Sequence, residues 1–318
     1  MNFLYFLENL RNPVCDFIFS AITYFGDETL FMVVGMIFFW CVNKFTGYFL
    51  LITGFYGTAI NQFLKLIFRI PRPWVKDPNF TAIESAKEGA GGFSFPSGHT
   101  QTSVGLYTGV ALSNKNLAIR ITSIALCVLV PFSRMYLGVH TPLDVGVSIA
   151  IALALSFIGF PLFKKAEHNP KIMYGIIITL GAIVTAFMLY VYLYPFPSDV
   201  YLPENVVNLE SAQKNAYTLL GCMFGFLAVY LIDSKFIKFE VKAVWWAQIL
   251  KVVGGLLCVL FVKEVLRFPI DWICQGHLVG RAIRYFLMVA VGGIAWPLTF
   301  KWFAKLGGKR KKAESKTE

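Results

Sequence analysis

Three short segments, far apart in the chain, carry side chains suited to phosphate chemistry. The first contains Lys65, Arg69 and Arg72, whose spacings of four and three residues place the cations on one side of a helix. Pro71 and Pro73 end that helix. Three cations on one helical face favour an anion site, although each of them taken singly is better explained as a charge at a helix end that extends towards water.

The second segment, residues 95–100, reads Phe-Pro-Ser-Gly-His-Thr and leads directly into an apolar run. Ser97 and Gly98 at the start of a helix leave backbone N–H groups available, and the helix dipole adds partial positive charge there. Such a turn can hold a phosphate. The alternative interpretation is structural: Ser97 is an N-cap, Gly98 provides backbone freedom and His99 is an ordinary interfacial histidine.

The third segment contains Ser133, Arg134, His140 and Asp144. Thr141 and Pro142 suit the N-cap and the first position of a helix, so Asp144 lies about one turn from His140. A carboxylate there can accept the Nδ1–H of the imidazole and leave Nε2 as a basic, nucleophilic nitrogen. Alternatively, Asp144 stabilises the helix start and His140 is a bystander.

The composition indicates that the elements which position these residues lie in a membrane. The 318 residues are 57% hydrophobic and 15% charged, whereas the surface of a soluble domain needs about a quarter of its residues charged. The 31 Phe, 14 Tyr and 7 Trp residues exclude a disordered chain. The expected fold class is all-α, a polytopic membrane helical bundle.

Nine apolar runs are candidates for spanning helices, each of which needs about 20 residues. They cover residues 28–43, 46–64, 100–113, 117–137, 141–163, 171–194, 215–232, 244–266 and 281–304. The chain then divides into an interfacial or partly inserted N-terminal helix (1–27), a catalytic membrane core (28–194), C-terminal transmembrane helices (195–306) and a basic, disordered tail (307–318). The first residues lack the basic region and cleavage site of a signal peptide.

The net charge of +11 is concentrated in alternate connections between these runs. The basic residues there are Lys44, Lys115, Arg120, Lys164, Lys165, Lys171, Lys235, Lys238, Lys242 and those of the lysine-rich end from Lys301 onward. The positive-inside tendency makes this face cytoplasmic. This orientation places the three segments on the extracytoplasmic or lumenal face, the N-terminus outside and the C-terminus in the cytoplasm. A charge distributed in this way predicts a lipid bilayer as partner and no nucleic acid.

The three segments therefore meet on one membrane face, where they supply cations, an N–H-rich turn and two of the four histidines. Ionisable groups at membrane depth are costly, so such a cluster indicates function, here phosphoryl transfer. The six cysteines form no C-x-x-C or zinc-like spacing, and the sequence supplies no ligand set for Mg²⁺ or Zn²⁺. We expect metal-independent chemistry with no cofactor.

At these residues the chain resembles the type 2 phosphatidic acid phosphatase (PAP2) and vanadium haloperoxidase superfamily. Its signature K-x6-R-P, P-S-G-H and S-R-x5-H-x3-D is matched without departure by Lys65-x6-Arg72-Pro73, Pro96-Ser97-Gly98-His99 and Ser133-Arg134-x5-His140-x3-Asp144. Eleven specified positions at fixed spacing make a chance match very rare. The resemblance covers about residues 28–163. The nine-span layout also resembles the glucose-6-phosphatase branch of the superfamily.

The resemblance implies a mechanism. His140 attacks phosphorus through Nε2 and forms a phosphohistidine, while Asp144 holds the imidazole ring. His99 protonates the leaving group and then deprotonates water. The residues that hold the phosphate oxygens are Lys65, Arg72, Ser97, Gly98 and Arg134. Arg69 lies outside the family pattern and is expected to be an interfacial cation.

The expected substrate is a membrane lipid phosphate, because a site at the bilayer surface can bind a phosphate whose tail stays in the membrane. Phosphatidate, phosphatidylglycerol phosphate and a polyprenyl diphosphate such as undecaprenyl diphosphate all fit. The alternatives are a soluble sugar phosphate and a non-catalytic anion or phospholipid transporter. The residues Glu264, Arg267, Asp271, His277, Arg281 and Arg284 around the last outer loop form either a second polar patch near the active site or an ordinary solvated loop.

Overall fold

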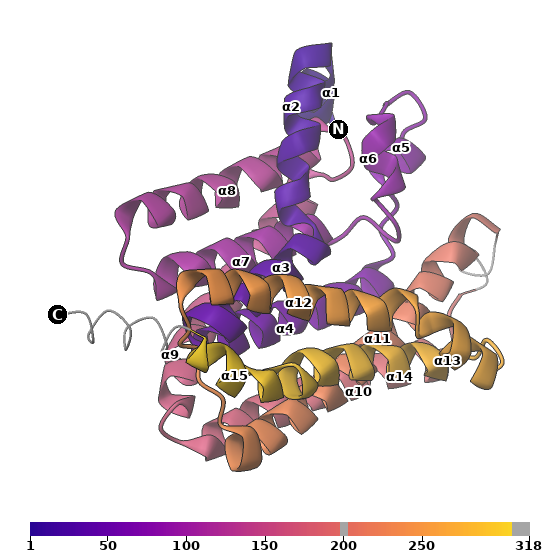
Figure 1. Cartoon of the computed structure of the whole chain (residues 1–318). Helices are drawn as coiled ribbons and strands as arrows, with labels where there is room; N and C mark the ends of the chain where they lie inside the picture. Colours follow the sequence, from indigo (N-terminus) through magenta and orange to yellow (C-terminus); the bar gives the residue numbers. More distant parts are fainter. Residues whose placement is uncertain (198–202, 307–318) are drawn as a thin grey trace.

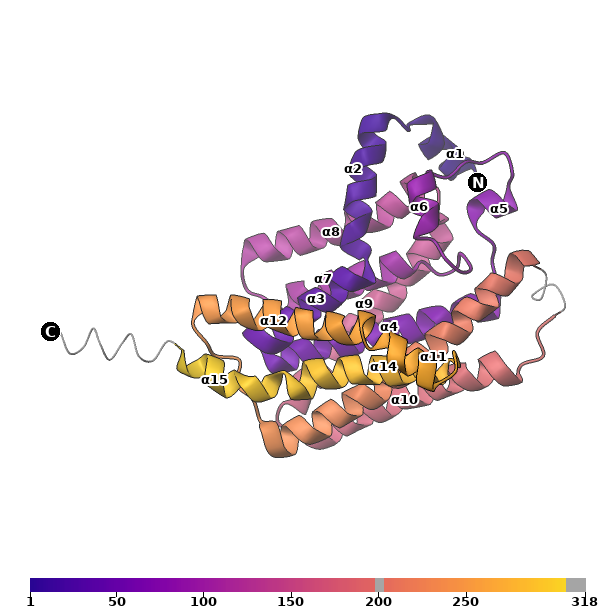
Figure 2. The same ribbon diagram turned by 45° about the vertical axis from the view of Figure 1, so that its right-hand side comes forward.

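Helices make up all the regular structure in the computed structural model, which describes residues 1–197 and 203–306. The predicted tail, residues 307–318, lies outside the described residues. Long helices run side by side along one direction, and α1 and α2 stand across them at one edge (Figures 1 and 2). The expected all-α membrane bundle is confirmed.

The core is built from six long helices that follow one another up and down. They are α3 (Glu28–Ile37), α4 (Lys44–Phe68), α7 (Gly98–Ser113), α8 (Leu117–Tyr136), α9 (Pro142–Ala166) and α10 (Pro170–Leu193). All six begin at a polar residue whose side chain accepts a hydrogen bond from the first turn. These caps are Asp27, Asn43, Ser97, Asn116, Thr141 and Asn169, as expected for short polar side chains before apolar runs. α7 packs against α4, α8 and α9 and thus occupies the middle of the core.

Shorter helices lie at the end of the core where α4 ends and α9 begins. They are α1 (Asn2–Asn9), α2 (Pro13–Thr23), α5 (Pro73–Lys76) and α6 (Glu84–Glu88). α2 packs on α8 and continues through a three-residue turn into α3, with a bend of 50° between the two helical stretches. The sequence prediction for residues 1–27 was a single helix, whereas the structure has two helices, separated at Leu10 and Asn12.

The C-terminal part adds a second group of helices against the core. It contains α11 (Pro203–Ile232), α12 (Trp245–Glu264), α13 (Arg267–Ile273), α14 (Val279–Ala290) and α15 (Phe300–Lys305). α11 packs on α4 and α10 of the core and on α14 within the group. A Cβ added at Gly221 would lie 2.2 Å from the carbonyl oxygen of Ala282, and one at Gly225 would lie 2.6 Å from Val289. The two glycines, four residues apart, let α11 and α14 approach closely, as small residues do in membrane helix pairs.

Each of the nine predicted spans coincides with a helix, but not every one of these helices is long and apolar enough to cross a membrane. Six helices of the described residues are, or seven if α2 and α3 form one bent span. α7 and α12 are not among the six, and α7 has 16 residues, which is short for a straight crossing. The chain is a multi-pass membrane protein with a core and a C-terminal transmembrane extension.

Candidate active site

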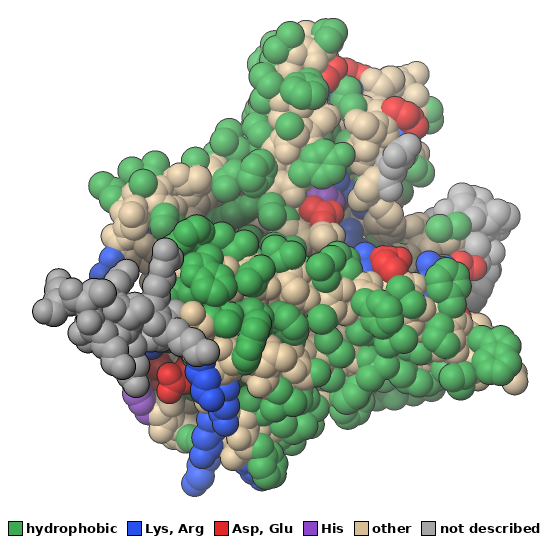
Figure 3. Space-filling model, in the orientation of Figure 1, with side chains coloured by type: hydrophobic (Ala, Val, Ile, Leu, Met, Phe, Trp, Pro, Cys, Tyr) green, Lys and Arg blue, Asp and Glu red, His purple; other side chains and the backbone are tan. Residues whose placement is uncertain are grey.

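The fold brings the three predicted segments together in one cavity of about 330 Å³. The predicted residues that line it are Lys65, Arg72, Gly98, His99, Arg134 and His140. They lie at the end of α4, after that helix, at the start of α7, at the end of α8 and before α9. The up-and-down order of the core puts all these helix ends on the same side. Figure 3 shows acidic, basic and histidine side chains in a hollow between α2 and the long helices, in an otherwise largely hydrophobic surface.

His140 is buried, and its Nε2 lies 2.9 Å from Nη1 of Arg72. A guanidinium group can only donate hydrogen bonds, so Nε2 accepts and carries no proton. The proton of the neutral ring is therefore on Nδ1. This is the tautomer that the sequence predicted for a nucleophilic Nε2, and it follows here from the partner of the ring.

Asp144 lies on the Nδ1 side of the ring, at 3.5 Å between Nδ1 and Oδ2. This distance is longer than an ordinary hydrogen bond, so the carboxylate faces Nδ1 without forming the predicted Nδ1–H bond. Oδ2 instead accepts from the hydroxyl of Ser94 at 2.6 Å and from the backbone N–H of Thr141 at 2.7 Å. Thr141 is the N-cap of α9 and forms a capping box with Asp144, as its sequence position predicted.

The cations of the first segment are held by backbone carbonyl groups of the chain between α6 and α7. Arg72 donates to the carbonyls of Gly91 at 2.9 Å and Gly92 at 3.1 Å, and to that of Val139 at 3.0 Å. Lys65 donates to the carbonyls of Phe93 and Ser94. Neither cation has a carboxylate within salt-bridge distance among the described residues. Their positive charge is thus available to an anion in the cavity.

Arg134 is the most deeply placed cation of the cavity and is 2% exposed. Its Nη1 donates to the hydroxyl of Thr23 at 2.7 Å, while its Nε has no hydrogen-bond partner among the described residues. Thr23 ends α2, so the N-terminal helices hold a site residue in place. No sequence motif marks Thr23, and sequence reasoning missed it.

Ser97 and Gly98 differ in their positions relative to the cavity. Ser97 is fully buried, does not line the cavity, and accepts from the N–H of Thr100 at 3.4 Å as the N-cap of α7. This is the structural alternative considered from the sequence. Gly98 lines the cavity beside His99. Ser148 joins the two helix starts, because its hydroxyl lies 2.9 Å from both the Ser97 and the Asp144 carbonyl oxygens.

Arg69 does not share a helical face with Lys65 and Arg72, so that prediction is wrong. α4 ends at Phe68, and Arg69 has a left-handed backbone conformation with φ 50°. The reversal turns its side chain away from the cavity, towards the carbonyl of Leu66 and the ring of Phe196. The helix ends before the prolines because the chain must turn for Arg72 to reach the site.

Two acidic residues at the start of α3 also line the cavity, and neither was singled out from the sequence. Asp27 is the N-cap of α3 and accepts from the N–H of Thr29 at 2.7 Å, and Glu28 follows it. A carboxylate at a helix start is a common capping pattern, so the sequence carried no signal for a position in the site. The cavity thus combines a cationic interior with an acidic rim.

Burial and three nearby cations act together on His140. Burial is the largest cause that lowers the pKa of its imidazole well below the ordinary range, and Arg72, Arg134 and Lys65 lower the pKa further. The ring is therefore neutral at the pH where an exposed histidine takes up a proton. A neutral imidazole beside three cations can act as a nucleophile towards a bound phosphate.

Within residues 1–197 and 203–306, no group of three or more His, Cys, Asp and Glu side chains is placed to hold a metal ion. The expectation of metal-independent chemistry stays a prediction, which activity in the presence of a chelator tests.

Two family profiles match the chain on either side of the boundary between core and extension. The profile of the PAP2 superfamily matches residues 44–168. A second profile, described as PAP2 superfamily phosphatase, transmembrane extension, matches residues 217–310. Together the two matches cover more than half of the chain. No solved structure matches it significantly.

Three curated relatives are each similar to between a third and a half of the chain. Undecaprenyl-diphosphatase BcrC of Bacillus subtilis is 32% identical over 109 residues, which are 34% of this chain and 53% of that protein. A probable sphingosine-1-phosphate phosphatase of Dictyostelium discoideum is 29% identical over 46% of this chain and 38% of its own length. Phosphatidylglycerophosphatase B of Bacillus subtilis is 26% identical over 47% of this chain and 75% of its length. The chain thus spans about half or less of the first two relatives, and each of the three names refers to a lipid phosphate.

Proposed function

We propose that this chain, which belongs to the PAP2 superfamily, is a membrane phosphatase that hydrolyses a phosphomonoester or diphosphate of a lipid. The observation that carries the proposal is the convergence of two histidines and three cations on one cavity. The substrate class rests on the setting of that cavity in a multi-pass bundle and on relatives that are named for undecaprenyl diphosphate, sphingosine 1-phosphate and phosphatidylglycerophosphate.

In the first step, the lone pair of Nε2 of His140 forms a bond to phosphorus, and the bond from phosphorus to the leaving oxygen breaks. His99 donates a proton to that oxygen. The negative charge of the bound phosphate favours the protonated form of His99 before this transfer. The products of the step are the free lipid alcohol or lipid monophosphate and a phosphohistidine.

In the second step, His99 removes a proton from water, and the resulting oxygen attacks the phosphohistidine. The nitrogen to phosphorus bond breaks and inorganic phosphate leaves, so both histidines return to their starting forms. Asp144 faces Nδ1 of His140 at 3.5 Å. Its charge stabilises the imidazolium character that develops at each transition state.

The cations act on the phosphate oxygens. Arg72 donates to Nε2 of His140, and this contact must be exchanged for one to a phosphate oxygen before Nε2 can attack. Lys65 and Arg134 supply further positive charge, and the start of α7 at Gly98 supplies backbone N–H groups. Ser97 contributes through the helix start that it caps.

The site is proposed to face the extracytoplasmic or lumenal side. The basic connections gather at the opposite end of the bundle, where Lys115 and Lys164 line one surface hollow together with Asn43 and Glu167. Positive charge marks the cytoplasmic side of membrane proteins. Labelling of single cysteines in intact cells or sealed vesicles tests this orientation.

A substrate panel with the purified protein in detergent tests the function. We expect phosphate release from undecaprenyl diphosphate, phosphatidylglycerol phosphate or phosphatidate, with and without EDTA, and no release by His140→Ala. Good activity on hexose phosphate without activity on the lipids would show that the substrate is a sugar phosphate and not a lipid phosphate. Turnover by His140→Ala at the wild-type rate would exclude the covalent route, and wild-type protein without turnover of any phosphate would favour the transporter.

A further inference from the structure

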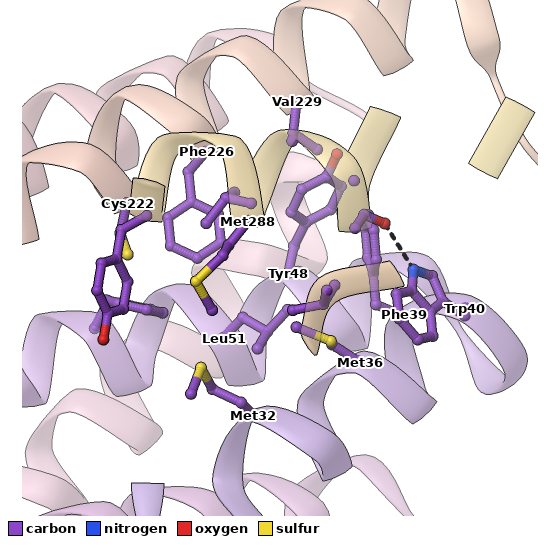
Figure 4. A pocket seen from close by; sticks show the side chains of 16 residues that line it. Met32, Met36, Phe39, Trp40, Tyr48, Leu51, Cys222, Phe226, Val229 and Met288 are labelled. Carbon is purple, nitrogen blue, oxygen red and sulfur yellow. Dashed lines mark hydrogen bonds between the residues drawn. The ribbon is translucent and has the colours of Figure 1, made fainter. Parts of the chain in front are cut away.

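A second cavity lies between the core and the C-terminal extension, and it is almost wholly apolar. Its volume is about 50 Å³, enough for roughly three or four water-sized groups. Figure 4 shows the side chains of Met32 and Met36 from α3 directed into this space with Met288 from α14 and Phe226 from α11. Methionine side chains are unbranched and adapt their shape to a guest, so this cavity can enlarge without movement of the helices.

Two core helices lead from the catalytic cavity to the apolar one. On α3, Glu28 lines the catalytic cavity, and Met32 and Met36 line the apolar cavity. Eight residues of helix separate Glu28 from Met36, or about 12 Å at 1.5 Å per residue. On α4, Gln62 lines the catalytic cavity and Phe55 the apolar one, seven residues or about 10 Å away.

Two helices of the extension also run from the catalytic cavity towards the apolar cavity. On α11, Asn215 donates to Gln62 at 3.0 Å, next to the catalytic cavity, and Cys222 lines the apolar cavity two turns further on. On α14, Arg281 donates to Thr218 of α11 at 2.6 Å, and Met288 lines the apolar cavity two turns further on. The same four helices, two from the core and two from the extension, therefore border the interface that lies between the two cavities.

Cations lie between the two cavities. The guanidinium groups of Arg281 and Arg284 lie 5.3 Å and 5.7 Å from the ring centre of Tyr285, which lines the apolar cavity. Arg281 is close enough to Glu28 for the two charges to interact. Nε of Arg284 is buried, with no hydrogen-bond partner among the described residues. The interface between core and extension thus presents a phosphate site, two arginines and an apolar cavity, which matches a phosphate attached to a hydrocarbon chain.

We propose that the hydrocarbon chain of the lipid phosphate enters a passage that opens between these four helices, at the interface of core and extension, and reaches the methionine-lined cavity. Arg281 and Arg284 then face the polar group that joins chain and phosphate, such as the second phosphate of a diphosphate. This inference rests on the proposed function and assigns to the extension the recognition of the substrate's chain. A long chain displaces the side chains of Met32, Met36 and Met288 as it enters.

Photocrosslinking of the wild-type protein tests the proposal without any change to the fold. The probe is a long-chain alkyl phosphonate with a diazirine on the chain, which binds as a phosphate but is not hydrolysed. We expect crosslinked peptides from α3, α11 and α14, and the same pattern with His140→Ala. Crosslinks confined to the outer surfaces of α8 and α9 would overturn the proposal and leave the proposed phosphatase function intact.

A pair of tryptophan variants gives an independent measurement. Met288→Trp fills the apolar cavity, whereas Ile283→Trp changes a residue of the same helix that is 41% exposed. We expect Met288→Trp to raise the KM for a long-chain lipid phosphate at least tenfold and to change kcat/KM for para-nitrophenyl phosphate less than twofold. Ile283→Trp should change neither. Equal kinetics of the two variants on the long-chain substrate would contradict the passage, and para-nitrophenyl phosphate hydrolysis reports the catalytic site separately.

Discussion

At the scale of single residues, the contact between Arg72 and His140 sets the state of the imidazole. The arginine donates to Nε2 and thereby fixes the tautomer of the ring. In the proposed mechanism, this contact is exchanged for one with a phosphate oxygen, so that the same residue stabilises the negative charge of the transition state.

The general acid is tested by a change at His99. His99→Ala should lower kcat for an alkyl phosphate by about 10²- to 10⁴-fold, because the leaving alkoxide is no longer protonated. The loss in the first step should be much smaller for para-nitrophenyl phosphate, whose leaving group needs no proton. The initial burst of nitrophenol is the measurement. An equal loss of the burst and of alkyl phosphate turnover would show that His99 does not act as the general acid.

The lowered pKa of His140 predicts a dependence of stability on pH. In the unfolded chain His140 titrates near about 6.5, whereas burial and the neighbouring cations lower the pKa in the folded state. Below pH 6.5 the unfolded chain then binds more protons than the folded one, so the stability falls as the pH falls. His140→Gln should lose less thermal stability than the wild type between pH 7.5 and pH 5. An identical loss in both proteins would contradict the lowered pKa.

At the scale of the elements, the end of α4 decides which cations enter the site. The left-handed conformation of Arg69 reverses the chain after Phe68 and brings Arg72 to the cavity. The other site residues lie at helix ends whose caps are local: Ser97 for α7 and Thr141 for α9. The positions of the site residues thus depend on where these helices begin and end.

A glycine at position 69 should stabilise this turn. The left-handed region costs a residue with a Cβ about 1 kcal/mol more than it costs glycine. Arg69→Gly is therefore expected to raise the free energy of unfolding by roughly 0.5 to 1 kcal/mol, measured by thermal unfolding in detergent. Activity should stay near wild type, because the Arg69 side chain points away from the cavity. Arg69→Ala is the matched control, which removes the charge and keeps the strain; greater stability of the alanine variant would contradict this account.

At the scale of the whole molecule, the extension is joined to the core by polar contacts inside an apolar interface. Nε1 of Trp40 donates to the carbonyl of Gly292 at 2.8 Å, and Nζ of Lys251 donates to the carbonyl of Trp40 at 2.8 Å. Both Trp40 and Lys251 are fully buried. Groups of this kind are costly to separate where no water replaces the bonds, so core and extension are expected to unfold together.

The contact of α11 with α14 holds the extension in shape. Gly221→Ala places a Cβ 2.2 Å from the carbonyl oxygen of Ala282, which is backbone and cannot rotate away. Gly175→Ala on α10 is the matched control, since no atom lies within 4 Å of its added Cβ. We expect a lower unfolding temperature for Gly221→Ala and an unchanged or higher one for Gly175→Ala. Similar shifts in both variants would show that the close approach does not matter.

The sequence predicted which residues meet in one cavity better than it predicted their local geometry. Lys65, Arg72, His99, Arg134 and His140 were all placed at one site, because alternate ends of successive membrane helices must meet on one side. The predicted position of Arg69 was wrong, because the sequence did not reveal a helix end four residues before Arg72. Contacts between distant segments were also missed.

Those missed contacts have a common physical reason. The hydroxyl groups of Thr23 on Arg134 and of Ser94 on Asp144 belong to no position of the signature, and their roles depend on how α2 and the segment before α7 fold back on the core. The interface between core and extension likewise depends on the packing of α14 against α11, which hydropathy does not encode. Periodicity and spacing predict elements, while such partners depend on tertiary packing.

The covalent intermediate is the most direct test of the account. The wild-type protein and the His99→Ala and His140→Ala variants are mixed with ³²P-labelled substrate carrying a good leaving group, quenched in alkali and digested for mass spectrometry. The account predicts a phosphorylated peptide that contains His140, a larger amount in His99→Ala because hydrolysis is slowed, and none in His140→Ala. A label on another residue, or turnover with no labelled enzyme in any of the three proteins, would contradict it.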